Sequence, residues 1–183
     1  MNLFGGWVGW LLAAAVVLIP TYAVGRSARE VPPALTGERY ASGFGGALWL
    51  FLAGQIAWLL TLVWQTAYMT SELWFMLERN PDTMKAAFVA VVPGAVSVLI
   101  GIWVIWQTAF RRTPAAAAYA VVGIWLMGPG ASLLQSWYFG LELTPTSLAK
   151  LLGWSILWSL YFAVSPRAAM TYGTPRGKRL AAE

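Results

Sequence analysis

Five long apolar runs cross this chain with almost no charge inside them, and this pattern limits what the chain can fold into. The runs are Phe4–Val24, Phe44–Met69, Ala86–Phe110, Pro114–Phe139 and Leu148–Val164, and Lys150 is the only charged residue within them. A bilayer core of about 30 Å takes about 20 helical residues to cross. The sequence therefore predicts an all-α integral membrane protein with five transmembrane helices, at about 4–24, 44–69, 81–110, 114–138 and 145–165.

Composition removes several classes of function. Hydrophobic residues make up 59% of the 183 residues and charged residues 10%, and the chain has no histidine and no cysteine. Ordinary zinc sites, bis-histidine haem and iron–sulfur clusters are therefore excluded. The acids are scattered through the connections, and no serine in a run has a general base near it in the sequence. We expect a single non-enzymatic membrane domain over 1–183, with no metal, no required cofactor and no nucleic-acid partner.

The basic residues lie in the connections, and their distribution orients the chain. If the five helices alternate in direction, nine Lys/Arg residues fall on one side of the membrane and three on the other. The nine are Arg26, Arg29, Arg39, Arg111, Arg112, Arg167, Arg176, Lys178 and Arg179. The positive-inside bias places the N-terminus outside and makes 173–183 a basic cytoplasmic tail. Because Met1–Leu3 lacks a basic residue, we expect the first run to be a retained helix and not a secretory signal.

Local signals mark helix ends and interruptions. A capping side chain precedes a proline at Asn80-Pro81, Thr113-Pro114 and Thr144-Pro145, which predicts three helix starts. Ser71–Arg79 mixes aromatic and acidic residues, and it is either a short interfacial helix or a loop with anchoring aromatics. Gly128-Pro129-Gly130 interrupts the fourth run. This break either frames a binding site or is a plain helix end or kink.

A stripe of small residues runs along the third helix. Ala90, Gly94, Ser97 and Gly101 recur at spacings of four, three and four, and Gly5 and Gly9 repeat the pattern in the first helix. Small residues let helix backbones approach closely in lipid. The stripe is typical of a helix–helix contact within the chain, and the alternative is a docking face for another protein.

Few side chains inside the runs offer a ligand anything polar. Gln55 is the strongly polar residue nearest mid-bilayer, and the tryptophans Trp58, Trp125, Trp154 and Trp158 also lie deep, where they could form the wall of a pocket. Our candidate ligand-binding residues, for a lipid, a quinone or a carotenoid, are Gln55, Trp58, Trp125, Gly128, Pro129 and Gly130. The alternative is that the amide bonds across helices and the indoles pack in the core.

Six basic residues are expected at the cytoplasmic surface, where they attract anionic lipid headgroups. They are Arg111, Arg112, Arg167, Arg176, Lys178 and Arg179.

Three short motifs give the chain a family resemblance over roughly residues 43–175. They are Gly45-Gly46 before an apolar helix, the junction Phe110-Arg111-Arg112-Thr113-Pro114, and a closing pattern of Tyr161-Phe162, Ser165, Arg167, Thr171 and Tyr172. With them the chain resembles an uncharacterised family of small bacterial inner-membrane proteins, domain of unknown function 2569. The resemblance implies a four-helix core at 43–175 with a cytoplasmic C-terminus, to which 1–25 adds a helix. Ala168 and Ala169 stand where that family tends to carry valine and lysine. The resemblance implies no function.

The sequence is compatible with two functions. The first is an accessory or structural subunit that packs against a larger complex in the bacterial inner membrane, with membrane lipids and another membrane protein as partners. The second is a small carrier, or a lipid-, quinone- or pigment-binding protein, with a site near the bilayer midplane.

Overall fold

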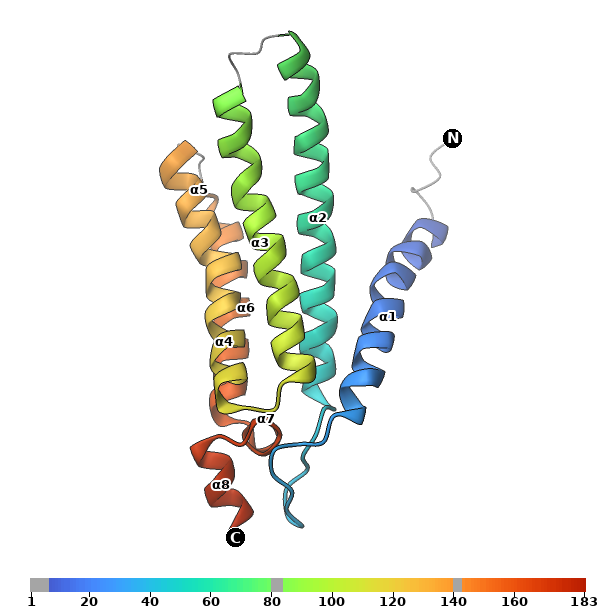
Figure 1. The fold of residues 1–183 in the computed structure, drawn as a ribbon, viewed down its shortest axis with the longest axis vertical. Helices are drawn as coiled ribbons and strands as arrows, with labels where there is room; N and C mark the ends of the chain where they lie inside the picture. The colour runs from blue at the N-terminus through green and yellow to red at the C-terminus, as the bar shows by residue number, and fades with distance from the viewer. Residues whose placement is uncertain (1–6, 80–83, 140–142) are drawn as a thin grey trace.

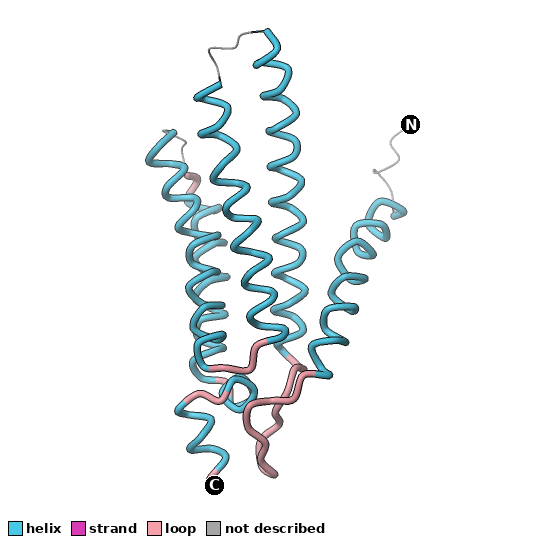
Figure 2. Tube along the Cα trace, viewed as in Figure 1, coloured by secondary structure: helices cyan, strands magenta, loops and turns pink. Residues whose placement is uncertain are grey.

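Helices make up most of the chain in the computed structural model, which describes residues 7–79, 84–139 and 143–183 (Figures 1 and 2). In chain order they are α1 (Trp7–Glu30), α2 (Ala47–Arg79), α3 (Met84–Phe110), α4 (Pro114–Trp125), the π-helical turn η2 (Leu126–Gly130), α5 (Ala131–Phe139), α6 (Pro145–Val164), α7 (Pro166–Tyr172) and α8 (Pro175–Ala181). The prediction of an all-α fold is confirmed.

Five helices are long and apolar enough to cross a membrane, which confirms the predicted number. The candidate spans are Trp10–Glu30, Ala47–Phe75, Val91–Phe110, Pro114–Leu134 and Pro145–Val164. The protein is thus a multi-pass helical membrane protein. Figure 1 shows the long helices running side by side, with α7 and α8 gathered at one end. We call this the α7 end of the bundle and the other the opposite end.

Two predicted boundaries differ from the structure. The first helix continues past residue 24 to Glu30, because nothing in Gly25–Glu30 breaks a helix strongly enough to stop it. The segment Ser71–Arg79 is neither a separate interfacial helix nor a loop, since it forms the last turns of α2. No proline interrupts the 33 residues of α2, and the Ser71 hydroxyl donates back to the Tyr68 carbonyl at 2.7 Å.

Two of the three expected helix starts are confirmed. Thr113 caps α4 by accepting the Ala116 N–H at 3.2 Å, and Thr144 caps α6 by accepting the Ser147 N–H at 3.3 Å. Each cap precedes a proline at the first helical position, where the missing N–H costs nothing. Asn80-Pro81 lies outside the described residues.

The Gly128-Pro129-Gly130 segment deforms the fourth helix without ending it. The chain there makes one π-helical turn, in which the Ala131 N–H donates to the Leu126 carbonyl five residues back. Pro129 has no N–H to donate, so the wider turn keeps the helix going past it. A Cβ on Gly130 would lie 2.9 Å from the Trp125 carbonyl oxygen, so this position favours glycine.

The small-residue stripe of α3 faces α2. A Cβ on Gly94 would lie 2.6 Å from the Thr66 hydroxyl oxygen, and one on Gly101 would lie 3.0 Å from Leu59 Cδ1. Ser97, between them, is buried. The side chain of Ala90 and the surroundings of Gly9 are not described, and Gly5 lies outside the described residues.

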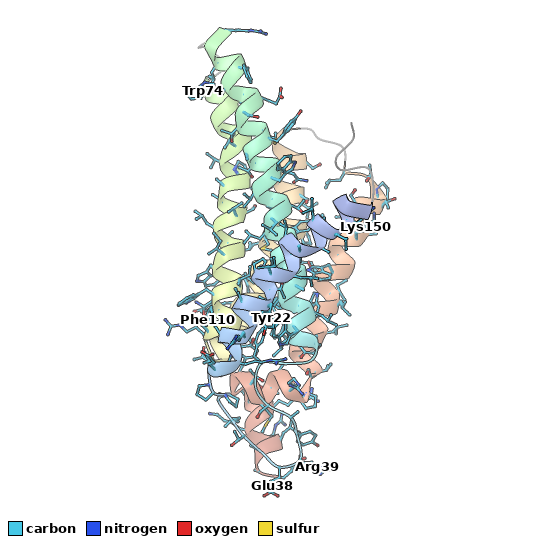
Figure 3. The ribbon with its side chains drawn as sticks, turned by 90° about the vertical axis from the view of Figure 1, so that its right-hand side faces the viewer. Tyr22, Glu38, Arg39, Trp74, Phe110 and Lys150 are labelled. Atoms are coloured by element: carbon cyan, nitrogen blue, oxygen red, sulfur yellow. The ribbon has the colours of Figure 1, made fainter. Side chains whose placement is uncertain are left out.

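Helix α1 holds to the bundle at its C-terminal half and diverges from it toward its N-terminal half (Figure 1). Trp49 of α2 makes the contact. A Cβ on Gly25 would lie 2.5 Å from its indole ring, the Tyr22 ring centroid is 6.4 Å away, and the Arg29 guanidinium lies 4.9 Å from the indole centroid. Figure 3 shows Tyr22 in this lower part of α1.

The segment expected to be a basic tail is folded onto the end of the bundle. Ser165 caps α7, and Gly173 ends it in the left-handed conformation at φ 63°, which favours glycine. The connection between α1 and α2 also lies at this end of the bundle and is hydrogen-bonded to α7. Ala34 N–H donates to the Thr171 carbonyl at 3.1 Å, and the Thr171 hydroxyl donates to the Gly43 carbonyl at 3.2 Å. The prediction overlooked this because helices as short as α7 and α8 have weak periodicity.

Candidate functional site

A cavity of about 400 Å³ lies between α2, the π-helical turn and α6. Its wall includes three of the candidate ligand-binding residues, Gln55, Trp58 and Gly128. The remaining wall is apolar for the most part and comes from Trp154, Leu151 and their neighbours. This volume falls within the roughly 300–1,000 Å³ that ligand pockets occupy.

Polar atoms without partners line this cavity. Gln55 is 1% exposed, and in the described part of the structure neither its amide nitrogen nor its amide oxygen has a hydrogen-bond partner. The Ser155 hydroxyl, also 1% exposed, and the Trp58 indole N–H are unpartnered there as well. A buried polar group left unpaired costs about 1–3 kcal/mol. A molecule in the cavity that reached these atoms would remove this cost.

The two polar side chains lie at the same depth. Gln55 is about 12 Å along α2 from its start at Ala47, and Ser155 is about 13 Å along α6 from its end at Val164. Both helix ends are at the α7 end of the bundle (Figure 1). With the edge of a hydrocarbon core of about 30 Å set at these helix ends, the pair lies near its middle.

A cluster of aromatic rings lies next to these wall residues, on the side of the α7 end. One turn below Gln55, the Phe51 ring packs edge-on against Trp158 at 4.9 Å and against Phe162 at 5.3 Å. Phe162 in turn lies 5.8 Å from the Tyr172 ring. At the other end of the cavity the wall residues are exposed, namely Thr61 and Lys150. Figure 3 places Lys150 in the half of the molecule away from the α7 end.

The other three candidate residues do not line this cavity. Trp125 is 37% exposed, and its indole N–H donates to the Ser159 hydroxyl at 3.0 Å. Pro129 is buried in the π-helical turn, and Gly130 allows the close approach of the Trp125 carbonyl. They shape the helix that carries Gly128.

The sequence placed Trp154 deep in the bilayer, but no residue of the α6 wall was among the candidate ligand-binding residues. Leu151, Trp154, Ser155 and Trp158 follow the three-and-four spacing of one helix face, but this spacing does not tell which helix lies opposite. Gly54 gives the clearest local hint, because a Cβ there would lie 2.3 Å from the Trp154 ring. A glycine one position before Gln55 thus allows the indole to approach α2.

A second cavity of about 200 Å³ adjoins the first. It lies between α2, α3 and the start of α5, and Trp58 and Met127 belong to the walls of both cavities. Gly94 and Ser97 of the stripe also line it. The small residues of α3 therefore line part of this second cavity, in addition to packing against α2.

Arg112, expected at the lipid surface, turns inward instead. Its guanidinium donates to the Thr108 carbonyl at 2.9 Å and to the Ala28 carbonyl at 2.6 Å, and lies 5.5 Å from the Phe44 ring centroid. Burial lowers the pKa of Arg112, and the nearby Tyr172 opposes this shift. The carbonyls at the ends of α3 and α1 hold the charge, because helix C-termini leave such groups unpaired.

Tyr172 completes this cluster. Its hydroxyl donates to the same Thr108 carbonyl at 2.8 Å, and its side chain is fully buried. Burial raises the pKa of the phenol, while the charge of Arg112 lowers it to a smaller extent. Segments from all three motifs of the family resemblance thus meet at the α7 end, since Gly45 lies against the Arg167 guanidinium there.

The remaining basic residues differ in their surroundings. Arg176 is partly buried and donates to the Ala163 carbonyl at 3.1 Å. Arg111, Lys178 and Arg179 are exposed.

No family model matches the chain, and no curated protein or solved structure matches it either. The resemblance to the uncharacterised inner-membrane family therefore stays a prediction from its motifs.

Proposed function

We propose that this protein binds a small, largely apolar molecule, such as a membrane lipid or quinone, in the cavity between α2, the π-helical turn and α6. The supporting observation is the pairing of an apolar wall with the unpartnered atoms of Gln55 and Ser155 at mid-depth. Most buried side-chain polar atoms in natural proteins have a partner, so these atoms call for an explanation. Among the described wall residues Lys150 is the one charged side chain, and it is exposed, so binding is favoured over catalysis.

Filling the cavity tests this proposal. A Cβ on Gly128 would lie 3.7 Å from the Ser155 hydroxyl and 4.0 Å from Leu151, which is ordinary contact. Gly128→Ala is therefore the control that the fold accepts, and Gly128→Leu is the variant that occupies the space. Leu151→Trp fills the same space from α6, in case the leucine variant does not fold.

The measurement is native mass spectrometry of protein purified in a mild detergent. We expect a one-to-one small-molecule adduct on the parent and on Gly128→Ala, and its loss from the filled variants. Identical adducts on all of these proteins would mean surface lipid and would refute the proposal. A parent with no adduct, and no gain on adding membrane extract, would refute it too.

The orientation proposed with this function puts the α7 end in the cytoplasm. Nine of the twelve Lys/Arg residues lie in the segments at that end. Because the chain has no cysteine, single cysteines at Ala182 and Ser147 can be labelled in intact cells with an impermeant maleimide. Labelling of the Ser147→Cys protein alone is expected, and labelling of Ala182→Cys alone would reverse the orientation.

The accessory-subunit function remains a second candidate, and the surface of α1 favours it. Trp10 in the N-terminal half of α1 is 80% exposed, and Ile19 at the middle of the helix is 68% exposed. An apolar cleft of about 230 Å³ between α1, α2 and α3 includes Pro20 and Leu60. A helix of a partner membrane protein would cover these surfaces.

Site-specific photo-crosslinking tests this second candidate. A photoreactive residue at Ile19 should capture one discrete protein in native membranes, whereas the same residue at Leu157, 57% exposed on α6, should capture only lipid. Equal, lipid-only products at both positions would rule out a partner on α1.

A further inference from the structure

We infer that the molecule bound in this cavity carries a neutral head with carbonyl-type oxygen atoms, as a quinone does, and that Gln55 and Ser155 donate to those oxygens. This inference rests on the proposed binding function and narrows its ligand.

Charge excludes an ionic head at the bottom of the cavity. Among the wall residues in the described part of the chain only Lys150 is charged, and it is exposed in the half of the molecule away from the α7 end. A phosphate or carboxylate beside Gln55 would be buried without a counter-charge, which costs far more than a few hydrogen bonds return. The head at mid-depth is therefore neutral.

Depth excludes the glycerol esters of ordinary bilayer lipids. The hydrocarbon core ends at the headgroup region, so ester carbonyls of a lipid in the bilayer stay near the interface. Only the hydrocarbon tail of such a lipid would reach Gln55 and Ser155. A tail would leave their polar atoms unpaired, and the cost of burying them would remain.

Three of the four unpartnered atoms can donate. The Gln55 amide nitrogen carries two hydrogens, and the Ser155 hydroxyl and the Trp58 indole carry one each; the Gln55 carbonyl oxygen and the Ser155 hydroxyl oxygen can also accept. A ligand with acceptor oxygens on a flat, apolar ring would accept from these donors. The indoles of Trp58 and Trp154 provide aromatic faces for the ring, and the apolar wall toward Thr61 leaves room for a tail.

Calorimetric titration of the purified, delipidated protein with three probes that share one tail tests the inference. The probes are decyl-1,4-benzoquinone, decylbenzene and decyl phosphate. We expect the quinone to bind at least about tenfold more tightly than decylbenzene. Gln55→Leu should remove about tenfold of the quinone affinity, which is about 1.4 kcal/mol, and leave decylbenzene unchanged.

The matched control is Gln107→Leu. Gln107 lies on α3, is partly buried, and lines neither cavity described above. This variant should bind all three probes as the parent does, which separates an effect of the site from a general effect of losing a glutamine.

The outcomes distinguish the two proposals. Equal affinities for quinone and decylbenzene, both lost in Gly128→Leu, would overturn the carbonyl inference and keep the binding site. Tightest binding of decyl phosphate would overturn it in favour of an anionic head paired with Lys150. Probe binding that Gly128→Leu and Leu151→Trp leave unchanged would place the probes elsewhere, and both proposals would fail.

Discussion

Replacing Gln55 by leucine should make the ligand-free protein more stable, although the residue lies at the centre of the proposed site. Both polar atoms of the amide are unpartnered, and the side chain is 1% exposed. An unpaired buried polar group costs about 1–3 kcal/mol, and leucine has a similar volume without that cost. For a protein of this size, about 1 kcal/mol corresponds to about 2–4 °C in Tm. We therefore expect Tm to rise by about 2–12 °C.

The assay is thermal unfolding of washed, delipidated protein in one detergent, followed by intrinsic fluorescence. Gln107→Leu is the control and should change Tm little. A fall in Tm for Gln55→Leu would mean that the amide has a partner in the folded protein, and the reasoning from unpaired atoms would be wrong. If Gln55 is retained for ligand binding at the expense of stability, Gln55→Leu should raise the stability of the protein and weaken ligand binding.

Two further substitutions test other parts of the fold. Tyr172→Phe removes the bond to the Thr108 carbonyl and should cost about 0.5–1.5 kcal/mol at pH 7, measured as a lower Tm. Burial raises the pKa of Tyr172 in the folded protein. As pH rises past about 10, the phenol therefore ionises in the unfolded chain before it ionises in the folded protein. This difference lowers the stability of the folded protein above about pH 10 and leaves it unchanged at lower pH. The phenylalanine variant should lose less stability than the parent between pH 9 and pH 11, and equal losses would contradict the burial argument. Gly54→Ala should displace Trp154 and destabilise the protein by about 1–3 kcal/mol, whereas Gly153→Ala, which meets no atom within 4 Å, should be harmless.

The sequence was sufficient for the five helices because their signals are local. Apolar length and a threonine before a proline act within one helix, so α4 and α6 begin where predicted. Gln55 stood out for the same reason, as a polar residue at mid-depth. Ser155 did not, since its importance depends on which face of α6 meets α2.

For Arg112 the prediction from the sequence was wrong. A charged residue in a connection is normally solvated, so the sequence placed it at the lipid surface. In the fold it meets two carbonyls that helix ends leave free, one from α3, the helix just before it, and one from α1, 84 residues earlier. Such a partner is supplied by tertiary structure and has no counterpart in the neighbouring sequence.

The way α7 is bonded bears on how the protein is made. During synthesis α1 and its connection to α2 emerge long before α7, yet Ala34, Leu35 and Gly43 of that connection find their bonding partners on α7. Translation must therefore pass residue 172 before the connection between α1 and α2 can make these bonds. A chain stopped at Val164 would contain the five spans and the contacts of Trp49 and Arg112 with α1, but would lack the hydrogen bonds that join the first connection to the C-terminal segment.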